Sequence, residues 1–125
     1  MTRSRGLGDV YKRQPLAGGL LTGKYLNNEM PTDSRITRVS TIGDRVNKNA
    51  MKAVQEYMKI SKKFNIHPVH LALAFCTKRP FMGSVIFGAT TDEQLDVVIK
   101  GLDVDLNDEI MKEISLVYKN YALTF

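Results

Sequence analysis

The chain has 125 residues, of which 43% are hydrophobic, and its 18 Lys and Arg outnumber its 13 Asp and Glu. This length fits one small domain or a piece of a larger one. Because no apolar run reaches the ~20 residues of a membrane span and the start lacks a secretory signal, we expect a cytoplasmic protein without a membrane partner. Because the chain has one Cys and two His, we expect neither a disulfide framework nor a metal site.

The excess positive charge lies at the start of the chain. Residues 1–14 carry four basic side chains against Asp9 alone, so the remainder is nearly balanced. A nucleic-acid-binding domain should carry clustered Lys and Arg on its folded part, so we expect no nucleic-acid partner. Residues 4–14, SRGLGDVYKRQ, resemble a translated sequencing-library adapter. We therefore expect residues 1–14 to be an artefactual or disordered leader, with the natural sequence beginning near Pro15 and upstream residues lost.

The next segments predict a loop, a surface excursion and a helix. Residues 15–25, PLAGGLLTGKY, hold three Gly and no helical period, which indicates a loop. Residues 26–48 are polar and predict a long surface excursion. Residues 49–64 place apolar side chains at three- and four-residue spacing and predict an amphipathic helix. The members of its apolar face are Ala50, Val54, Tyr57, Met58 and Ile60.

The second half alternates helices with one short strand. Pro68 suits the first turn of a buried helix that ends by residues 78–80. Residues 84–87, Ser-Val-Ile-Phe, predict a buried strand. Thr91 followed by Gln94 is a capping box, which predicts a helix over residues 92–100 with Gly101 as its stop. Asn107 should cap a last helix with one apolar face: Ile110, Met111, Ile114, Val117, Tyr118 and Tyr121.

This order of elements is typical of an α/β protein with parallel strands. Only one convincing strand is present, and a lone buried strand would leave its backbone N–H and C=O groups unpaired. We therefore expect the C-terminal part of a larger α/β fold, incomplete as given.

Two constellations could bind a ligand. In the turn Gly88-Ala-Thr-Thr91, a glycine and the following helix start favour an anion such as phosphate, although an ordinary helix cap explains the same residues. The loop from Gly18 and Gly19 to Lys24 offers flexible backbone and a positive charge, although spacing alone favours a plain surface turn with a solvated lysine. It does not have the spacing of a Walker A loop.

Together these motifs resemble a family. PLAGGLLTGKY, then Ser34-Arg35, then HPVHLALAF with KRPF, then SVIFGATTDEQL are similar to the C-terminal part of aldo-keto reductases, on the branch that includes potassium-channel β-subunits and bacterial general reductases. The resemblance implies that residues 15–125 are the C-terminal portion of one (β/α)8 TIM barrel, which needs ~250 residues. It further implies NADPH-dependent reduction of an aldehyde or ketone to an alcohol, with a small carbonyl compound as substrate.

The resemblance also assigns cofactor contacts in the loops after strands seven and eight. The pyrophosphate would lie against the start of the first loop, where Gln14 replaces the usual serine, and the adenosine 2′-phosphate end against the second. The family's polar adenine contacts fall near Val97 and Val98, which leaves the preference between NADP and NAD open. The implied NADP(H)-binding residues are Pro15, Leu16, Ala17, Gly18, Lys24, Ser34, Arg35, Gly88, Thr90 and Gln94.

The resemblance places the catalytic Asp, Tyr, Lys and His on the first four strands, so no residue of this chain is expected to be catalytic. His67, His70 and Cys76 are read as structural members of a buried helix. Two alternatives remain open: a reductase-like regulatory or interaction subunit, and a small basic nucleic-acid-binding protein. The substrate's identity and the oligomeric state cannot be read from these residues.

Overall fold

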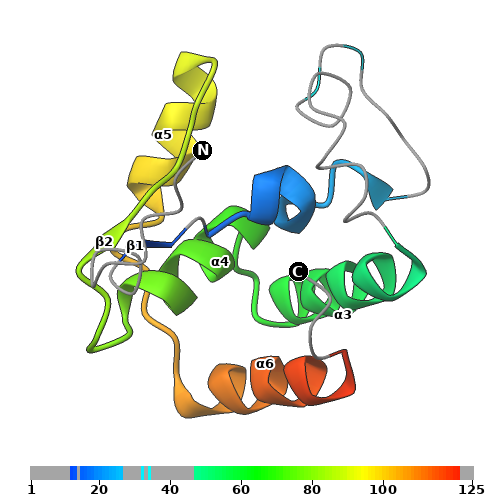
Figure 1. The fold of residues 1–125 in the computed structure, drawn as a ribbon. Coiled ribbons are helices and arrows are strands. Elements are labelled where there is room, and N and C mark those ends of the chain that lie inside the picture. The colour runs from blue at the N-terminus through cyan, green and yellow to red at the C-terminus, as the bar shows by residue number, and fades with distance from the viewer. Residues whose placement is uncertain (1–11, 14, 27–31, 33, 35–46, 122–125) are drawn as a thin grey trace, which may run out of the picture.

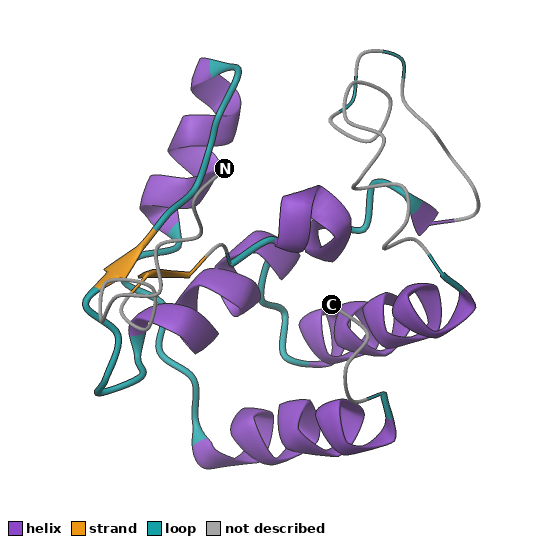
Figure 2. Cartoon of the chain, in the orientation of Figure 1, coloured by secondary structure: helices purple, strands orange, loops and turns teal. Residues whose placement is uncertain are grey.

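A computed structural model describes residues 12, 13, 15–26, 32, 34 and 47–121 of the chain. Within them, helices predominate over two very short strands (Figures 1 and 2). In chain order the elements are β1 (Lys12–Arg13), the 3-10 segment η2 (Ala17–Thr22), α3 (Lys48–Lys63), α4 (Pro68–Thr77), β2 (Ser84–Val85), α5 (Asp92–Lys100) and α6 (Asp108–Asn120). Most of the expected surface excursion over residues 26–48, including Arg35, lies outside the described residues.

The two strands form a parallel pair, with Lys12 opposite Ser84 and Arg13 opposite Val85. The strand β1 lies within residues 1–14, for which the sequence predicts an artefactual or disordered leader. The pairing shortens the strand expected over residues 84–87, because Ile86 and Phe87 follow β2 with 45% and 41% of their surface exposed. A strand remains paired only as far as its partner extends, and β1 spans two residues.

Side-chain caps fix the starts of three helices. The Oδ1 atom of Asn47 accepts from the Ala50 backbone N–H at 2.8 Å, which begins α3 one residue before the predicted start. Asn107 begins α6 as predicted, accepting from the Ile110 N–H at 2.9 Å. Thr91 begins α5, whose bounds agree with the prediction. Each cap satisfies a backbone donor that the first helical turn leaves without a partner.

Helices α3 and α6 lie side by side and run in opposite directions (Figure 1). Ile110, Ile114 and Val117 bury one face of α6 against Ala53 and Ile60 of α3. The predicted face of α6 was too wide, because Tyr118 is 61% exposed. It follows Val117 directly and is therefore turned about 100° from the buried stripe.

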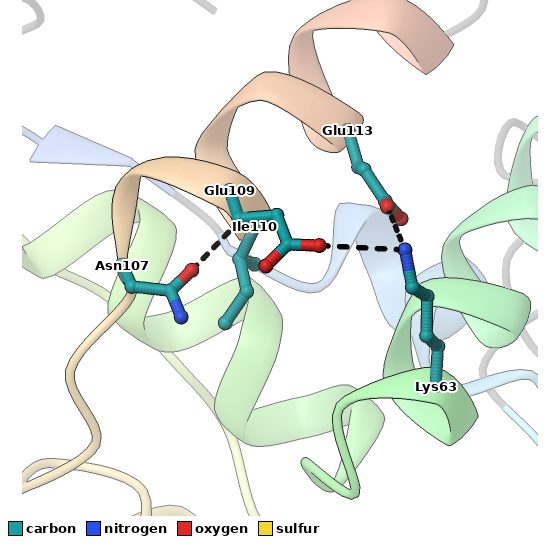
Figure 3. Close-up of polar contacts among 5 residues, drawn as sticks. All are labelled: Lys63, Asn107, Glu109, Ile110 and Glu113. Carbon is teal, nitrogen blue, oxygen red and sulfur yellow. Dashed lines mark hydrogen bonds and ion pairs between the residues drawn. The ribbon is translucent and has the colours of Figure 1, made fainter.

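An ion pair ties the C-terminal end of α3 to the N-terminal half of α6 (Figure 3). The ammonium group of Lys63 contacts the Glu113 carboxylate and lies 3.6 Å from that of Glu109. Its hydrogen bond to Glu113, more than the charge itself, raises the pKa of Lys63. The charges are exposed, so the contact sets the register of the two helices more than it stabilises them.

Helix α4 lies between the other elements and contacts α3, α5, β2 and η2. Val69 and Leu73 of α4 bury Val98 of α5, and three half-buried side chains pack against this cluster: Leu16, Val85 and Val97. We call these six residues the α4–α5 cluster. It joins the segment after β1, the strand β2 and the helix α5 in one apolar unit. None of the described helices is long and apolar enough to cross a membrane.

Candidate functional site

The segments after β1 and after β2 leave the strand pair at the same edge, because the strands are parallel. In open and closed parallel sheets, the carboxyl ends of the strands are where ligands bind. The α4–α5 cluster holds the two segments together through Leu16 on one side and Val97 on the other. This edge is therefore the candidate site.

The first segment makes a tight left-handed turn. Ala17, Gly18 and Gly19 have φ values of 48°, 72° and 99°, and the Leu16 carbonyl accepts from the Gly19 N–H at 2.8 Å. Only glycine adopts such φ values without steric cost, so Ala17 is strained. The sequence predicted a loop here, and the structure shows an ordered 3-10 segment anchored by Leu20, which is 1% exposed.

The end of this segment pairs an exposed cation with a buried phenol. Lys24 is exposed, and its ammonium nitrogen lies 5.0 Å from the centre of the Tyr25 ring. Tyr25 is only 2% exposed, and its hydroxyl has no hydrogen-bond partner among the described residues. Tyr25 is the last residue of the segment that the sequence predicts to be a loop, and that prediction did not mark it as buried.

Two further expected site residues lie in the excursion that follows. Ser34 is buried, with 7% of its surface exposed. Arg35 lies outside the described residues, so the structure gives no position for its guanidinium group. Pro15, the first of the expected residues, is buried.

The second segment joins β2 to α5 and is open to solvent. Gly88 is exposed, and a Cβ atom placed on it would meet nothing within 4 Å. The Oε1 atom of Gln94 accepts from the Thr90 backbone N–H at 3.0 Å and from the Thr90 hydroxyl at 3.1 Å. These bonds fix the orientation of the Gln94 amide, whose Nε2 donor is not used in them. One half of the capping box forms as predicted, because the Gln94 backbone N–H donates to the Thr91 hydroxyl at 3.3 Å. The other half is shifted, since the Gln94 side chain accepts from the Thr90 N–H in place of the Thr91 N–H.

The start of α5 carries opposing electrostatic features. Backbone N–H groups and the helix dipole favour an anion there, whereas Asp92 and Glu93 occupy the first turn. A backbone hydrogen bond, followed by one from the Thr91 hydroxyl, lowers the pKa of Glu93.

Val97 and Val98 belong to the α4–α5 cluster, so neither gives a polar contact to the candidate site. Val98 is 4% exposed and packs on α4, and Val97 belongs to the same apolar cluster. His70 and His67 agree with the structural roles expected of them. His67 accepts from the Val69 N–H at its Nδ1 atom, and His70 contacts the Val97 carbonyl.

The donor chemistry of the two segments suits a phosphate-bearing ligand. Lys24 supplies an exposed positive charge, Gln94 an oriented amide, and Gly88 open backbone. A hollow of about 440 Å³ lies between α3 and α6 and includes none of these residues. Its charged walls are neutralised within themselves by the Lys59–Glu56 and Lys63–Glu113 pairs.

Comparison with known proteins gives a consistent result. The model of the Aldo/keto reductase family matches residues 1–119. The chain is 37% identical to Protein tas of Escherichia coli K12 over 86% of its own length and 31% of that protein. It is 32% identical to a probable voltage-gated potassium channel subunit beta of Oryza sativa subsp. japonica, over 85% of the chain and 34% of that protein.

A third relative carries the name of an enzyme. The chain is 33% identical to the L-glyceraldehyde 3-phosphate reductase of Escherichia coli K12, over 71% of the chain and 27% of that protein. The chain thus spans about a third of the length of the curated relatives it matches. The few strands described here accord with part of the (β/α)8 barrel that the family implies. From the extent of the family match, the chain belongs to the aldo/keto reductase family.

Proposed function

We propose that the whole protein is an NADPH-dependent oxidoreductase that reduces an aldehyde or ketone to an alcohol. In this proposal the present chain supplies the cofactor-binding loops after barrel strands seven and eight, and the catalytic tetrad lies outside it. Family membership supports the reductase class, as do relatives that are named as reductases or oxidoreductases. Association with a channel or another partner is an alternative that no contact described above favours.

The observation that carries the proposal is the parallel pairing of β1 with β2. The left-handed turn at residues 17–19 and the open Gly88–Thr91 turn both follow the carboxyl ends of this strand pair. The α4–α5 cluster then fixes their separation through Leu16, Val85 and Val97. A dinucleotide is long and carries phosphates at separate points, so it requires two donor segments at a fixed distance.

Each segment has a distinct proposed task. Pro15, Leu16, Ala17 and Gly18 line the pyrophosphate, where the positive φ values let the backbone approach closely. Lys24, Ser34 and Arg35 close over the cofactor, and Lys24 balances phosphate charge. Gly88, Thr90 and Gln94 hold the adenosine 2′-phosphate end. When bound, the reduced nicotinamide supplies the hydride, and the residues of this chain bind and orient the cofactor.

The affinity for the 2′-phosphate rests on few groups. Asp92 and Glu93 oppose an anion at the start of α5, and the apolar Val97 and Val98 add no polar contact. Discrimination of NADPH from NADH must therefore come from Thr90, Gln94 and the cations that close over the site. We expect this preference to be modest and strongly weakened by salt.

The test is a calorimetric titration of the full chain with adenosine 2′,5′-bisphosphate and with adenosine 5′-monophosphate, which differ by the 2′-phosphate. We expect the bisphosphate to bind more tightly, and Gln94→Leu to reduce that advantage about tenfold, the size of one charge-assisted hydrogen bond. Gln55→Leu is the matched control, because Gln55 is an exposed glutamine on α3. Equal affinity for the two nucleotides in the unmodified chain would contradict the proposal.

A further inference from the structure

The C-terminal end of α5 differs from those of the other helices. At α3, α4 and α6, the N–H of the residue after the helix bonds to the carbonyl four residues earlier. At α5, the Gly101 N–H bonds instead to the Val98 carbonyl, three residues earlier, at 3.0 Å. The helix tightens at this point, and the Val97 carbonyl is left outside the regular ladder.

A side chain from another helix forms a hydrogen bond with that carbonyl. The Nε2 atom of His70, in the first turns of α4, lies 2.7 Å from the Val97 oxygen. A carbonyl oxygen can only accept, so Nε2 carries the proton and His70 donates. His70 is therefore a C-terminal cap of α5 supplied by α4, a role that water or a local side chain usually fills.

Gly101 provides the space for this contact. Its φ of −79° is open to any residue, so the glycine is not required by the backbone. A Cβ atom at this position would lie 2.7 Å from Cδ2 of His70 and 3.2 Å from Cδ1 of Leu73. The missing side chain lets the imidazole ring reach the end of α5. His70, Val97 and Gly101 thus form an interlocked joint between the two helices.

The joint controls the orientation of α5 because α4 is its principal neighbour among the described elements. The nine residues of α5 make a rod about 14 Å long. The joint and Val98 lie in the C-terminal half of this rod, and Thr90 and Gln94 lie at its N-terminal end, with Gln94 about 4.5 Å along the axis from Val97. A small rotation at the joint would therefore displace the second donor segment relative to the first.

We propose that His70 is a positioning residue that aims α5, and with it the Thr90–Gln94 pair, at the bound nucleotide. The proposal rests on the proposed function for its ligand, but the joint itself can be tested without one. His70 touches no reacting group. It acts through the Val97 carbonyl and the space at Gly101.

The first test measures hydrogen exchange of the full chain by mass spectrometry. We expect His70→Leu to reduce exchange protection in α5 about tenfold while α6 keeps its protection, since one hydrogen bond and its alignment are lost. His70→Gln should restore it, because a glutamine amide places a donor near the position of Nε2. His67→Gln is the matched control, as His67 caps its own helix α4. Unchanged protection of α5, or an equal loss in α5 and α6, would overturn the proposal.

The second test measures the affinity for adenosine 2′,5′-bisphosphate relative to the 5′-monophosphate. A positioning role predicts that His70→Leu lowers this ratio about three- to tenfold and that His70→Gln restores it. A ratio untouched by His70→Leu would overturn the positioning role. If the unmodified chain binds the two nucleotides with equal affinity, the proposed function fails. The exchange measurement then decides alone whether the joint exists.

Discussion

Replacing Gly101 with Ala reverses a common rule of helix stability. At a glycine with helical φ, alanine usually stabilises a protein by about 0.4–1 kcal/mol, because it restricts the unfolded chain. Gly101 has such a φ, of −79°. Yet the added methyl group would lie 2.7 Å from Cδ2 of His70, closer than carbon atoms approach, and the ring has no flexible end that could move aside.

The expected size follows from three contributions. Overpacking costs about 1–3 kcal/mol, and displacing the ring from the Val97 carbonyl costs about 0.5–1.5 kcal/mol more. The entropic gain of about 0.4–1 kcal/mol offsets part of this. We therefore expect Gly101→Ala to lower the free energy of unfolding by about 1–3 kcal/mol, where the backbone rule alone predicts an increase.

A double-mutant cycle isolates the cause. In a His70→Ala background the ring is absent, and only the mobile end of Leu73, 3.2 Å away, remains close to the new methyl group. Gly101→Ala should there be neutral or slightly stabilising. Urea unfolding followed by circular dichroism gives all four free energies, and a coupling of about 2 kcal/mol is expected. The reasoning is refuted if Gly101→Ala stabilises the unmodified chain or costs the same in both backgrounds.

Two further predictions concern pH and the core. Burial, followed by the charge of His70, lowers the pKa of His67, so the unfolded chain binds more protons and stability should fall slightly below about pH 6.5. His67→Asn, which caps α4 without titrating, should remove this dependence, and an unchanged pH profile of the urea midpoint would contradict it. Ile114→Ala should cost about 2–4 kcal/mol because Ile114 is buried, whereas Ile99→Ala, at a side chain that is 51% exposed, should stay within about 0.5 kcal/mol. Equal urea midpoints for these two variants would contradict the packing described here.

Local signals predicted the helices well. Thr91 begins α5 and Asn107 begins α6, because side-chain caps depend on neighbouring residues alone. Gly101 follows the end of α5 as predicted, although its φ of −79° is not the left-handed value that the stop signal assumes. The strands were predicted less well. The extent of β2 is decided by the length of β1, which is distant in sequence and lies in a segment whose resemblance to an adapter predicted a leader. Tyr118 was misplaced because periodicity does not say how wide a face the partner helix covers.

The candidate site also contains features that local sequence predicts and features that depend on packing. The glycines could be found from their spacing, since tight turns require them, whereas Thr90 was named only through the family resemblance. The buried Tyr25 hydroxyl and the reach of His70 to the Val97 carbonyl could not, because both depend on packing between distant segments. In the sequence, His70 is only a lone histidine in an otherwise apolar helix. Gly101, which makes room for its ring, follows 31 positions later.

The α4–α5 cluster limits where the sequences of two family members can be joined to make a chimera. Leu16 precedes α4, whereas Val85 and Val97 follow it, so any crossover between residues 26 and 84 inherits the two sides of the contact from different parents. Such chimeras would keep every helix and strand, and the two donor segments would still be wrongly placed relative to each other. Productive exchanges should therefore move these three side chains together, and their identities should covary when homologous chains are compared.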